Sequence, residues 1–311
     1  MVNTTVRPRI GLALGSGSAR GWSHIGIIKT LQAAGIEPDV IAGSSIGALV
    51  GASYVTGRLD ELEGWVRSLD RLDVARFFEI NTRFNGFVNK ERLHQFLNRY
   101  ICGDECRIES LPKKFAAVAT DLASGTEVWL SQGALLEAVW ASISLPGLFP
   151  AIRHHNRWLV DGALVNPVPI SICRSLGADI VIAVNLHGDI AGKHLREVSR
   201  EPPNKEGGDN DSWVDIVGRR VKEYSGVLFA NHKGTADTAP NLFDAIVGSI
   251  HITQDRITRY RIAADPPDIL LTPKLARLSP LEFYRAGEAI EEGYRVAHHT
   301  LPEIRQLIES F

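Results

Sequence analysis

A serine near the amino terminus lies in a pattern that supports nucleophilic catalysis. Residues 43–47 read GSSIG and match G-x-S-x-G, in which a sharp strand-to-helix turn projects the serine hydroxyl from a sheet. Gly43 and Gly47 would let the strand and the helix cross closely, and the start of the helix would favour negative charge beside Ser45. The same residues also fit an ordinary turn that caps a core helix. The pattern alone leaves an acyl-transfer nucleophile and a structural turn as alternatives.

A loop of small residues precedes this serine. Residues 15–21 read GSGSARG and follow a short apolar run at residues 9–14. Successive N–H groups in such a loop can point into one concavity and bind an anion, and we expect Gly17, Ser18 and Ala19 to supply donors for an oxyanion. A dinucleotide-binding loop is disfavoured, because the G-x-G-x-x-G register from Gly15 ends on Arg20 and no acidic residue ends the next strand.

Both motifs follow expected strands of one βαβ unit. Residues 9–14 and 38–42 are short apolar runs, and a helix between them is expected from about Ser23 to Gly35. In a right-handed βαβ unit the carboxyl ends of both strands lie at the same edge of the sheet. We therefore expect the small-residue loop and Ser45 to face one crevice.

The chain continues with alternating helices and strands, which indicates an α/β fold of several layers. The expected helices are residues 59–69, 90–101, 134–142 and 169–176, and the expected strands are residues 114–120, 126–130, 157–160 and 179–185. The first two helices would either cover the sheet or line an apolar cleft. The apolar loop at residues 143–150 would either pack in the core or form a wall of an acyl pocket. Asp161, at a strand end before Gly162 and Ala163, would either line the cleft or cap a turn.

The carboxyl-terminal part is expected to be helical. Residues 186–211 are charged and contain Gly and Pro without periodic apolar residues, which is typical of a long loop or a disordered segment. After them we expect helices at residues 214–230, 242–261 and 281–299, a strand at residues 268–271 and a last short helix to residue 311. We divide the chain into a catalytic core (1–185), this polar segment, and a helical extension packed on the core (212–311).

Composition excludes several classes of protein. The 311 residues are 44% apolar, which is ample for a large core, and a net charge of −2 gives no basic excess for nucleic acid. The amino terminus lacks the apolar run of a signal peptide, and runs such as residues 46–55 are too short to span a bilayer. We expect a cytoplasmic protein, with any membrane contact peripheral. Cys102, Cys106 and Cys173 match no metal-ligand pattern and are expected to be reduced and structural.

Four motifs together resemble a known family. GLALGSGSARGWSHIGIIKTLQ, GSSIG, ASISLPGLFP and VDGALVNPVP occur in the order seen in bacterial patatin-like phospholipases, a group that includes the esterase domain of neuropathy target esterase. Residues 269–289 also resemble bacterial members of the RssA type. The resemblance implies a three-layer α/β fold with a mainly parallel central sheet flanked by helices. It further implies a Ser–Asp dyad with Ser45 as nucleophile and Asp161 as general base, and no metal or cofactor.

The resemblance also assigns the small-residue loop. Residues 15–21 correspond to the glycine-rich oxyanion hole of the family. The residues of this hole are Gly15, Ser16, Gly17, Ser18 and Ala19, and the supporting motif residues are Arg20, Gly21, Gly43, Gly47, Gly162 and Ala163. Ser16 and Ser18 depart from the usual run of glycines, which a hole built from backbone N–H groups tolerates. Arg20 matches a basic position of the family and either binds a lipid phosphate or braces the loop, of which we favour bracing.

The sequence therefore predicts a lipid acyl hydrolase that acts on phospholipids, lysophospholipids or simpler carboxylic esters. One alternative is an α/β-hydrolase with a Ser–His–Asp triad, for which His298 and His299 are the late candidates. Another is a lipid-binding regulatory protein that keeps the scaffold without turnover. His24 is expected to pack or hydrogen-bond within the first helix, and His154 and His155 to form a polar turn. The oligomeric state and the physiological substrate are left open by the sequence.

Overall fold

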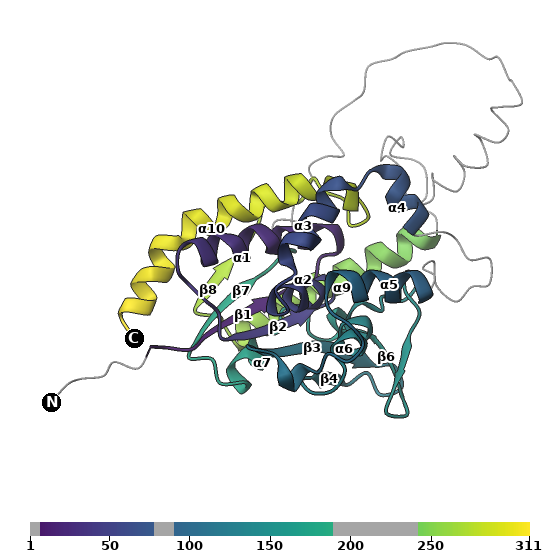
Figure 1. The fold of residues 1–311 in the computed structure, drawn as a ribbon, viewed down its shortest axis with the longest axis horizontal. Coiled ribbons are helices and arrows are strands. Elements are labelled where there is room, and N and C mark those ends of the chain that lie inside the picture. The colour runs from purple at the N-terminus through teal and green to yellow at the C-terminus, as the bar shows by residue number, and fades with distance from the viewer. Residues whose placement is uncertain (1–6, 78–89, 189–241) are drawn as a thin grey trace, which may run out of the picture.

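The computed structural model describes residues 7–77, 90–188 and 242–311 and has a central sheet between layers of helices (Figure 1). The sheet has eight strands in the order β5-β6-β3-β2-β1-β7-β8, with β4 paired to β3. The strands are β1 (Ile10–Leu14), β2 (Val40–Ser44), β3 (Lys114–Asp121), β4 (Glu127–Leu130), β5 (Ile152–His154), β6 (Arg157–Asp161), β7 (Ile180–Val184) and β8 (Ile269–Leu271). Strands β1, β2, β3, β7 and β8 are parallel, whereas β4, β5 and β6 pair antiparallel. The predicted mainly parallel α/β fold is confirmed.

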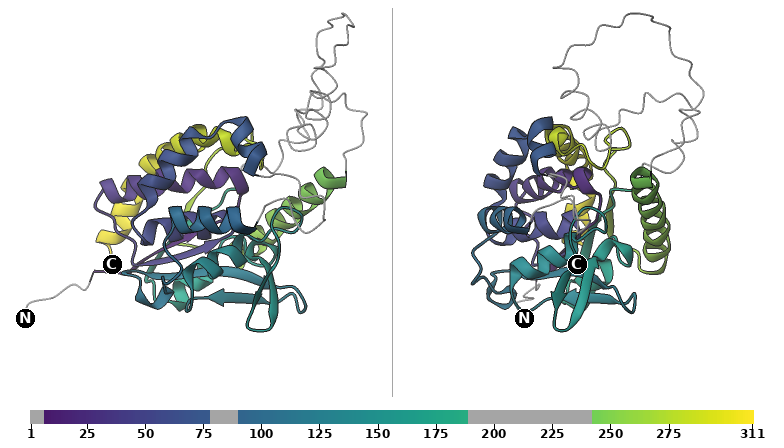
Figure 2. Two further views of the ribbon diagram at one scale, coloured as in Figure 1. Left: turned by 45° about the vertical axis from the view of Figure 1, so that its right-hand side comes forward. Right: turned by 90° about the vertical axis from the view of Figure 1, so that its right-hand side faces the viewer.

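Helices cover both faces of the sheet. They are α1 (Ser23–Ala33), α2 (Ile46–Val55), α3 (Leu59–Ser68), α4 (Arg71–Phe77), α5 (Lys90–Tyr100), α6 (Leu135–Ile143), α7 (Ile170–Ser175), α9 (Leu242–Ala264) and α10 (Ala286–Glu309). Side chains of α7 and α9 pack with one apolar cluster, and the other helices contribute to a second, larger cluster. Figure 2 shows α9 on the opposite side of the sheet from α1, α2 and α3. In the described part of the chain, no helix is long and apolar enough to cross a bilayer.

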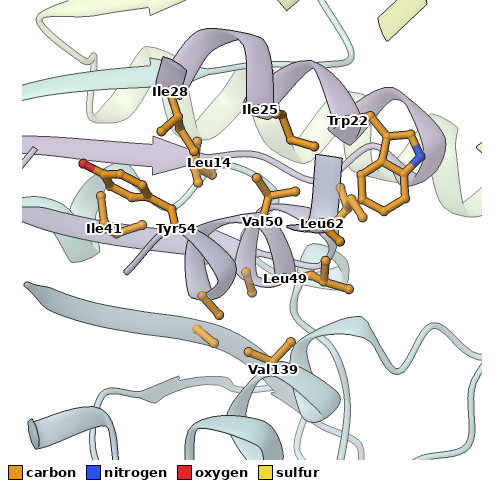
Figure 3. Packing of buried hydrophobic residues seen from close by; sticks show 14 of the residues in the cluster. Leu14, Trp22, Ile25, Ile28, Ile41, Leu49, Val50, Tyr54, Leu62 and Val139 are labelled. Atoms are coloured by element: carbon orange, nitrogen blue, oxygen red, sulfur yellow. The ribbon is translucent and has the colours of Figure 1, made fainter. Parts of the chain in front are cut away.

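The central strands are apolar because helices bury them on both faces. Every residue of β1, β2 and β7 is buried, which explains their continuous apolar runs. In Figure 3, Leu14 and Ile41 from the sheet lie beside Ile28 of α1 and Val50 of α2. Burial of one such aliphatic side chain stabilises the fold by about 1.5–3 kcal/mol, so this packing fixes the strands that lead into both motifs.

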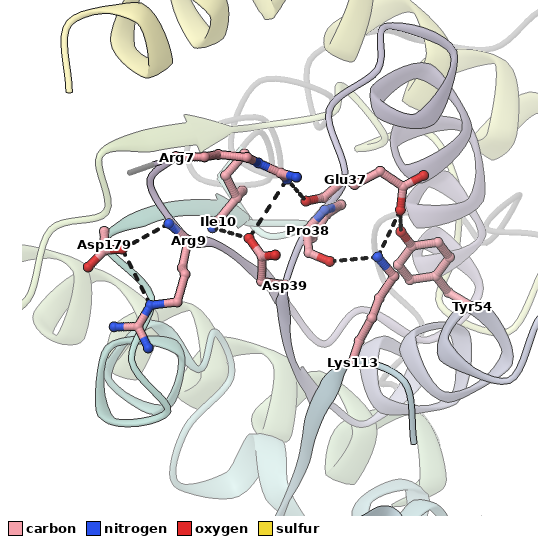
Figure 4. Close-up of polar contacts among 9 residues, drawn as sticks. All are labelled: Arg7, Arg9, Ile10, Glu37, Pro38, Asp39, Tyr54, Lys113 and Asp179. Atoms are coloured by element: carbon pink, nitrogen blue, oxygen red, sulfur yellow. Dashed lines mark hydrogen bonds and ion pairs between the residues drawn. The ribbon is translucent and has the colours of Figure 1, made fainter. Parts of the chain in front are cut away.

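Carboxylates fix the amino-terminal edge of the sheet, opposite the two motifs (Figure 4). Asp39 Oδ2 accepts a hydrogen bond from the Ile10 N–H at 2.8 Å, and Asp179 Oδ2 accepts one from the Arg9 N–H at 2.8 Å. Each bond joins the starts of two neighbouring strands, beside the backbone bonds from the Asp39 N–H to the Ile10 carbonyl at 2.7 Å and from the Asp179 N–H to the Arg9 carbonyl at 2.8 Å. The network holds the register of β1, β2 and β7.

Strands β2 and β6 lie end to end along one edge of β3. β2 runs parallel to β3 up to Ser44, opposite Val118, and β6 runs antiparallel to β3 up to Asp161, opposite Ala119. β4 pairs with residues 117–120 of β3, which include positions that also pair with β2 and positions that also pair with β6. Because one edge of a strand holds a single neighbour at each position, β4 lies on the other edge of β3. The carboxyl ends of β2 and β6 therefore meet, and the chain leaves both strands at that point.

Two expectations need correction, and two others fall outside the described residues. Residues 152–154 form strand β5, so His154 is not part of the turn, which consists of His155 and Asn156. The last two expected helices are one helix, α10, which continues through Pro302. Burial of Ala297 and Ile304 on either side of Pro302 keeps the helix continuous despite the lost hydrogen bond. The expected helix at residues 214–230, and residues 189–211 of the polar segment, lie outside the described residues.

We predict that the crossing of α1 and α10 depends on two glycines. A Cβ on Gly26 would lie 2.2 Å from the Ile290 carbonyl oxygen, and one on Gly293 would lie 2.0 Å from the Ser23 carbonyl oxygen. Gly26→Ala should therefore lower the free energy of unfolding by about 1–3 kcal/mol, measured by urea denaturation. Gly64, exposed on α3 with no atom within 4 Å of its Cβ position, is the matched control, and Gly64→Ala should raise stability by about 1 kcal/mol. A Gly26→Ala variant as stable as wild type would contradict this account.

Candidate active site

Ser45 occupies a strained turn between β2 and α2. Its backbone has φ 55° and ψ −124°, a conformation that non-glycine residues rarely adopt. A Cβ on Gly43 would lie 2.4 Å from the backbone of Ala48, and one on Gly47 would lie 2.1 Å from the Leu14 carbonyl oxygen. Only glycine fits at either position, as the G-x-S-x-G pattern predicts, and the turn lies directly against the end of β1.

Asp161 meets Ser45 where β2 and β6 end. The Ser45 hydroxyl donates a hydrogen bond to Asp161 Oδ2 at 2.6 Å, and the Ala163 N–H donates one to Asp161 Oδ1 at 2.8 Å. Both carboxylate oxygens are therefore engaged, one by the serine and one by the backbone of the DGA motif. Gly162 allows this turn, because a Cβ there would lie 2.2 Å from the Val118 carbonyl oxygen.

Three further residues hold this pair, and the sequence analysis did not single them out. Ser142 Oγ accepts a hydrogen bond from the Ser45 N–H at 3.0 Å. The Ser144 carbonyl accepts one from the Asp161 N–H at 3.0 Å, and Thr120 Oγ1 donates one to the Asp161 carbonyl at 2.8 Å. Ser142 and Ser144 lie within the ASISLPGLFP motif, so the motif itself was the available signal, whereas Thr120 carries no recognisable pattern.

Burial controls the protonation of Asp161. The side chain is fully buried, and desolvation raises its pKa from 3.8 to about 7, against the smaller lowering effects of its hydrogen bonds from Ser45 and Ala163. A carboxylate with a pKa near neutrality is a much stronger base than an ordinary aspartate. The pair therefore combines a hydroxyl with a proton acceptor tuned to neutral pH.

The small-residue loop has fewer available donors than the sequence suggests. The N–H groups of Gly15, Ser16 and Ala19 donate to the carbonyls of Val184, Pro167 and Pro280 at 2.8–3.1 Å. The expectation that Ala19 points a donor into the crevice is therefore wrong, because Pro280 already accepts it. Among the described residues, the N–H groups of Gly17 and Ser18 have no acceptor. Ser18, with φ 50°, adopts the left-handed conformation that the usual glycine would take easily.

Buried contacts fix this loop. The Arg20 Nε donates to the Leu278 carbonyl at 2.9 Å, which agrees with a bracing role for this side chain. A Cβ on Gly21 would lie 2.2 Å from Ile46, so the loop packs closely against the start of α2. His24 Nε2 lies 2.8 Å from the Gly15 carbonyl oxygen and bonds the loop rather than its own helix. Burial lowers the pKa of His24 to about 4, so the imidazole is neutral and donates through Nε2.

Ser45 opens into an apolar cavity with an empty volume of about 710 Å³. Every lining residue except Ser18 and Ser45 is apolar. The lining includes Trp65, Leu69, Val74, Phe77, Leu93 and Phe96 from α3, α4, α5 and the α3–α4 connection, and Ile143, Leu145, Leu148 and Phe149 from α6 and its loop. Helices α3 and α5 thus line a cleft, and the loop at residues 143–150 forms a wall of it. The apolar lining is that of a site for a hydrophobic ligand.

Other candidate residues lie away from this site. His298 and His299 are exposed on α10, and the hydroxyl of Ser45 donates to Asp161 rather than to a histidine. Within residues 7–77, 90–188 and 242–311, no group of three His, Cys, Asp or Glu side chains could hold a metal ion. The three cysteines are free thiols, and Cys102 and Cys173 are buried.

Comparisons with known proteins identify the family of this chain. The family model of the patatin-like phospholipases matches residues 12–174. The chain belongs to this family. It is 32% identical to an NTE family protein of Mycobacterium tuberculosis, over 94% of this chain and 91% of that protein. It is 28% identical to the lysophospholipase NTE1 of Kluyveromyces lactis, over 96% of this chain and 19% of that longer protein. The solved structure of VipD from Legionella pneumophila aligns with a TM-score of 0.43 and 14% identity, over 98% of this chain and 67% of that chain.

We predict that Asp161 destabilises the folded chain at high pH. Its folded-state pKa of about 7 lies above the ordinary 3.8, so the folded chain retains a proton that the unfolded chain has lost. Stability is therefore lost as the pH rises from about 4 through 7, by on the order of 4 kcal/mol. Asp161→Asn should raise the free energy of unfolding at pH 8, and the gain should shrink toward pH 4 in urea denaturation.

Asp179 provides a control of opposite sign. Hydrogen bonds from Arg9 lower the pKa of its carboxyl group, so its ionised form stabilises the fold above the ordinary pKa and that contribution is lost in acid. Asp179→Asn should therefore lower stability at pH 8. If Asp161→Asn also lowers the free energy of unfolding at pH 8, desolvation is not the dominant effect on the pKa of Asp161.

Proposed function

We propose that this protein hydrolyses carboxylic esters of lipids, with Ser45 as nucleophile and Asp161 as general base. The observation that carries the proposal is the 2.6 Å hydrogen bond from the Ser45 hydroxyl to a fully buried carboxylate, formed at an apolar cavity that Ser45 lines. Membership of the patatin-like phospholipase family and the similarity to a protein named lysophospholipase support lipid hydrolysis.

The proposed reaction has two steps that use the same carboxylate. Ser45 Oγ attacks the ester carbonyl carbon while its proton passes to Asp161 Oδ2, and a tetrahedral oxyanion forms. The C–O bond to the alcohol then breaks, Asp161 returns the proton to that alcohol, and an acyl-serine remains. Water next attacks the acyl carbon and gives a proton to Asp161, the ester bond to Ser45 breaks, and Ser45 regains the proton as the fatty acid leaves.

Backbone donors would stabilise the oxyanion. The Gly17 and Ser18 N–H groups have no acceptor among the described residues, and Ser18 lines the same cavity as Ser45. The amino terminus of α2 begins at Ile46, directly after the nucleophile, and its dipole favours negative charge there. We therefore restrict the proposed oxyanion hole to Gly17 and Ser18 and assign Gly15, Ser16 and Ala19 to fixing the loop. One such donor contributes about 3–4 kcal/mol to stabilising the transition state.

The cavity indicates the class of substrate. Its apolar lining has no charged group that would recognise a polar head group, so it fits the acyl chain rather than the alcohol. The alcohol part of the ester would then lie outside the cavity in solvent, where a charged glycerophosphate head group stays hydrated. We propose lysophospholipids or phospholipids as substrates, and simple carboxylic esters as analogues.

We predict that Ser45→Ala and Asp161→Asn each reduce ester hydrolysis by roughly 10³-fold or more, because either change removes the nucleophile or its proton acceptor. Wild-type kcat/KM should rise with pH and level off above about 7, as Asp161 ionises. Hydrolysis of a chromogenic ester and labelling by a fluorophosphonate probe measure both effects, and labelling should disappear in Ser45→Ala.

The exposed residues His298 and His299 supply the control for a histidine-dependent mechanism. A double His298→Ala, His299→Ala variant should keep wild-type activity, whereas a triad would lose it. Folded wild-type protein that neither labels nor hydrolyses any ester would instead favour a lipid-binding protein without turnover.

We further predict that kcat/KM increases with acyl-chain length, by up to about fourfold per methylene that enters the cavity, the equivalent of about 0.8 kcal/mol. Phe149→Ala should weaken this preference, because Phe149 is a partly exposed wall residue whose loss removes contacts with long chains but few with an acetyl group. A series of esters that share one alcohol and increase in acyl-chain length measures the slope. A Phe149→Ala variant with an unchanged slope would remove this residue from the acyl site.

A further inference from the structure

The β5–β6 hairpin projects from the body of the protein (Figures 1 and 2). His154 pairs with Arg157, and the two residues between them, His155 and Asn156, have φ 41° and 67°. Positive φ values at both central residues are typical of a type I′ turn, whose backbone twist matches that of the two strands in a hairpin. The tip therefore has a regular turn conformation rather than that of an irregular loop.

Large apolar side chains are exposed at this hairpin. Trp158 on β6 is 52% exposed, and Leu122, at the end of β3, is 58% exposed. The Leu122 N–H donates to the Trp158 carbonyl at 2.9 Å, so the two residues are neighbours across the sheet. An exposed tryptophan beside an exposed leucine indicates a contact surface, since tryptophan prefers the boundary between water and lipid.

The hairpin is also basic. Residues 151–158 contain two arginines and two histidines and no Asp or Glu. The acids that face it are Asp121, 3.8 Å from Arg157, and Glu137, 3.5 Å from His154. Arg153 makes no ion pair with any described residue and donates to the neutral Asn156 side chain at 2.6 Å. This cationic tip, on a chain with a net charge of −2, fits an anionic surface.

The hairpin is continuous with both parts of the candidate active site. The loop before it carries Leu148 and Phe149 of the cavity wall, and β6 ends at Asp161. Asp161 follows Trp158 by three residues, which is about 10 Å along an extended strand. The turn at the tip and Asp161 lie at opposite ends of β6, and Trp158 and Asp161 project from opposite faces of the sheet. The hairpin is therefore a surface separate from the cavity on the same strand.

We propose that the β5–β6 hairpin, together with Leu122, docks the protein on an anionic lipid bilayer, with the Trp158 ring at the interface and Arg153 and Arg157 on lipid phosphates. The inference rests on the proposed function in one respect, that the substrate is a bilayer lipid. It adds a membrane-contact surface on a strand that ends at Asp161, and a preference for anionic membranes.

The test is vesicle binding in a Ser45→Ala background, so that catalysis does not contribute. Sedimentation with phosphatidylcholine vesicles that contain phosphatidylglycerol should show binding that weakens with salt, and vesicles of phosphatidylcholine alone should bind less. Arg153→Gln and Arg157→Gln should each weaken binding roughly fivefold, and Trp158→Ala should weaken it on both vesicle types. Circular dichroism checks that each variant is folded.

Trp129→Ala is the matched control. Trp129 is 45% exposed but lies on β4, at the other edge of β3, with its ring N–H bonded to Glu127. Its loss should leave vesicle binding unchanged. Docking by the hairpin is overturned if the hairpin variants bind vesicles as well as the Ser45→Ala parent does. It is also overturned if Trp129→Ala weakens vesicle binding as much as Trp158→Ala does. Vesicle binding by a wild-type protein that hydrolyses no lipid would retain the docking surface and reject the proposed function.

Discussion

The edge of β3 is the constraint on which the active site depends. One edge of a strand holds a single neighbour at each position, so β2 must end where β6 ends, between Val118 and Ala119. Ser45 and Asp161 are 116 residues apart in the chain, yet this junction brings them within 2.6 Å. The strained backbone at Ser45 persists because the packing of β2 and α2 on either side prevents it from relaxing to a favourable conformation.

The same junction gives the pair its chemistry. Two strand ends and the helices above them exclude water from Asp161, and desolvation accounts for the raised pKa of its carboxyl group. Only hydrogen bonds from Ser45 and Ala163 act against it, and no charged side chain of the described residues contributes to the shift. A nearby arginine would have stabilised the carboxylate and weakened it as a base. The burial that lowers the stability of the fold is therefore what the proposed dyad, which has no histidine, requires.

The cavity follows from how the helices after the elbow pack. Trp65, Phe77, Phe96 and Tyr100 contact one another with ring centroids 4.7–6.4 Å apart, which joins α3, α4 and α5 into a cover with its own apolar interior. Three of these rings and the loop after α6 then face the space above Ser45. The aromatic residues thus stabilise the cover and also form a wall of the cavity proposed to hold the acyl chain.

The sequence by itself determined the strands β1, β2 and β7 and the turn at Ser45, because these depend on local patterns of burial and glycine. For Asp161 the local pattern left a cleft residue and a turn cap as alternatives, and only the resemblance to a family singled it out. Tertiary structure alone decided the rest. Whether the Ala19 N–H is available depends on Pro280, more than 200 residues away along the printed sequence. The role of Thr120, the continuity of α10 through Pro302 and the raised pKa of Asp161 likewise arise from contacts between distant segments. Such contacts leave no periodic or local trace in the sequence, so only the fold reveals them.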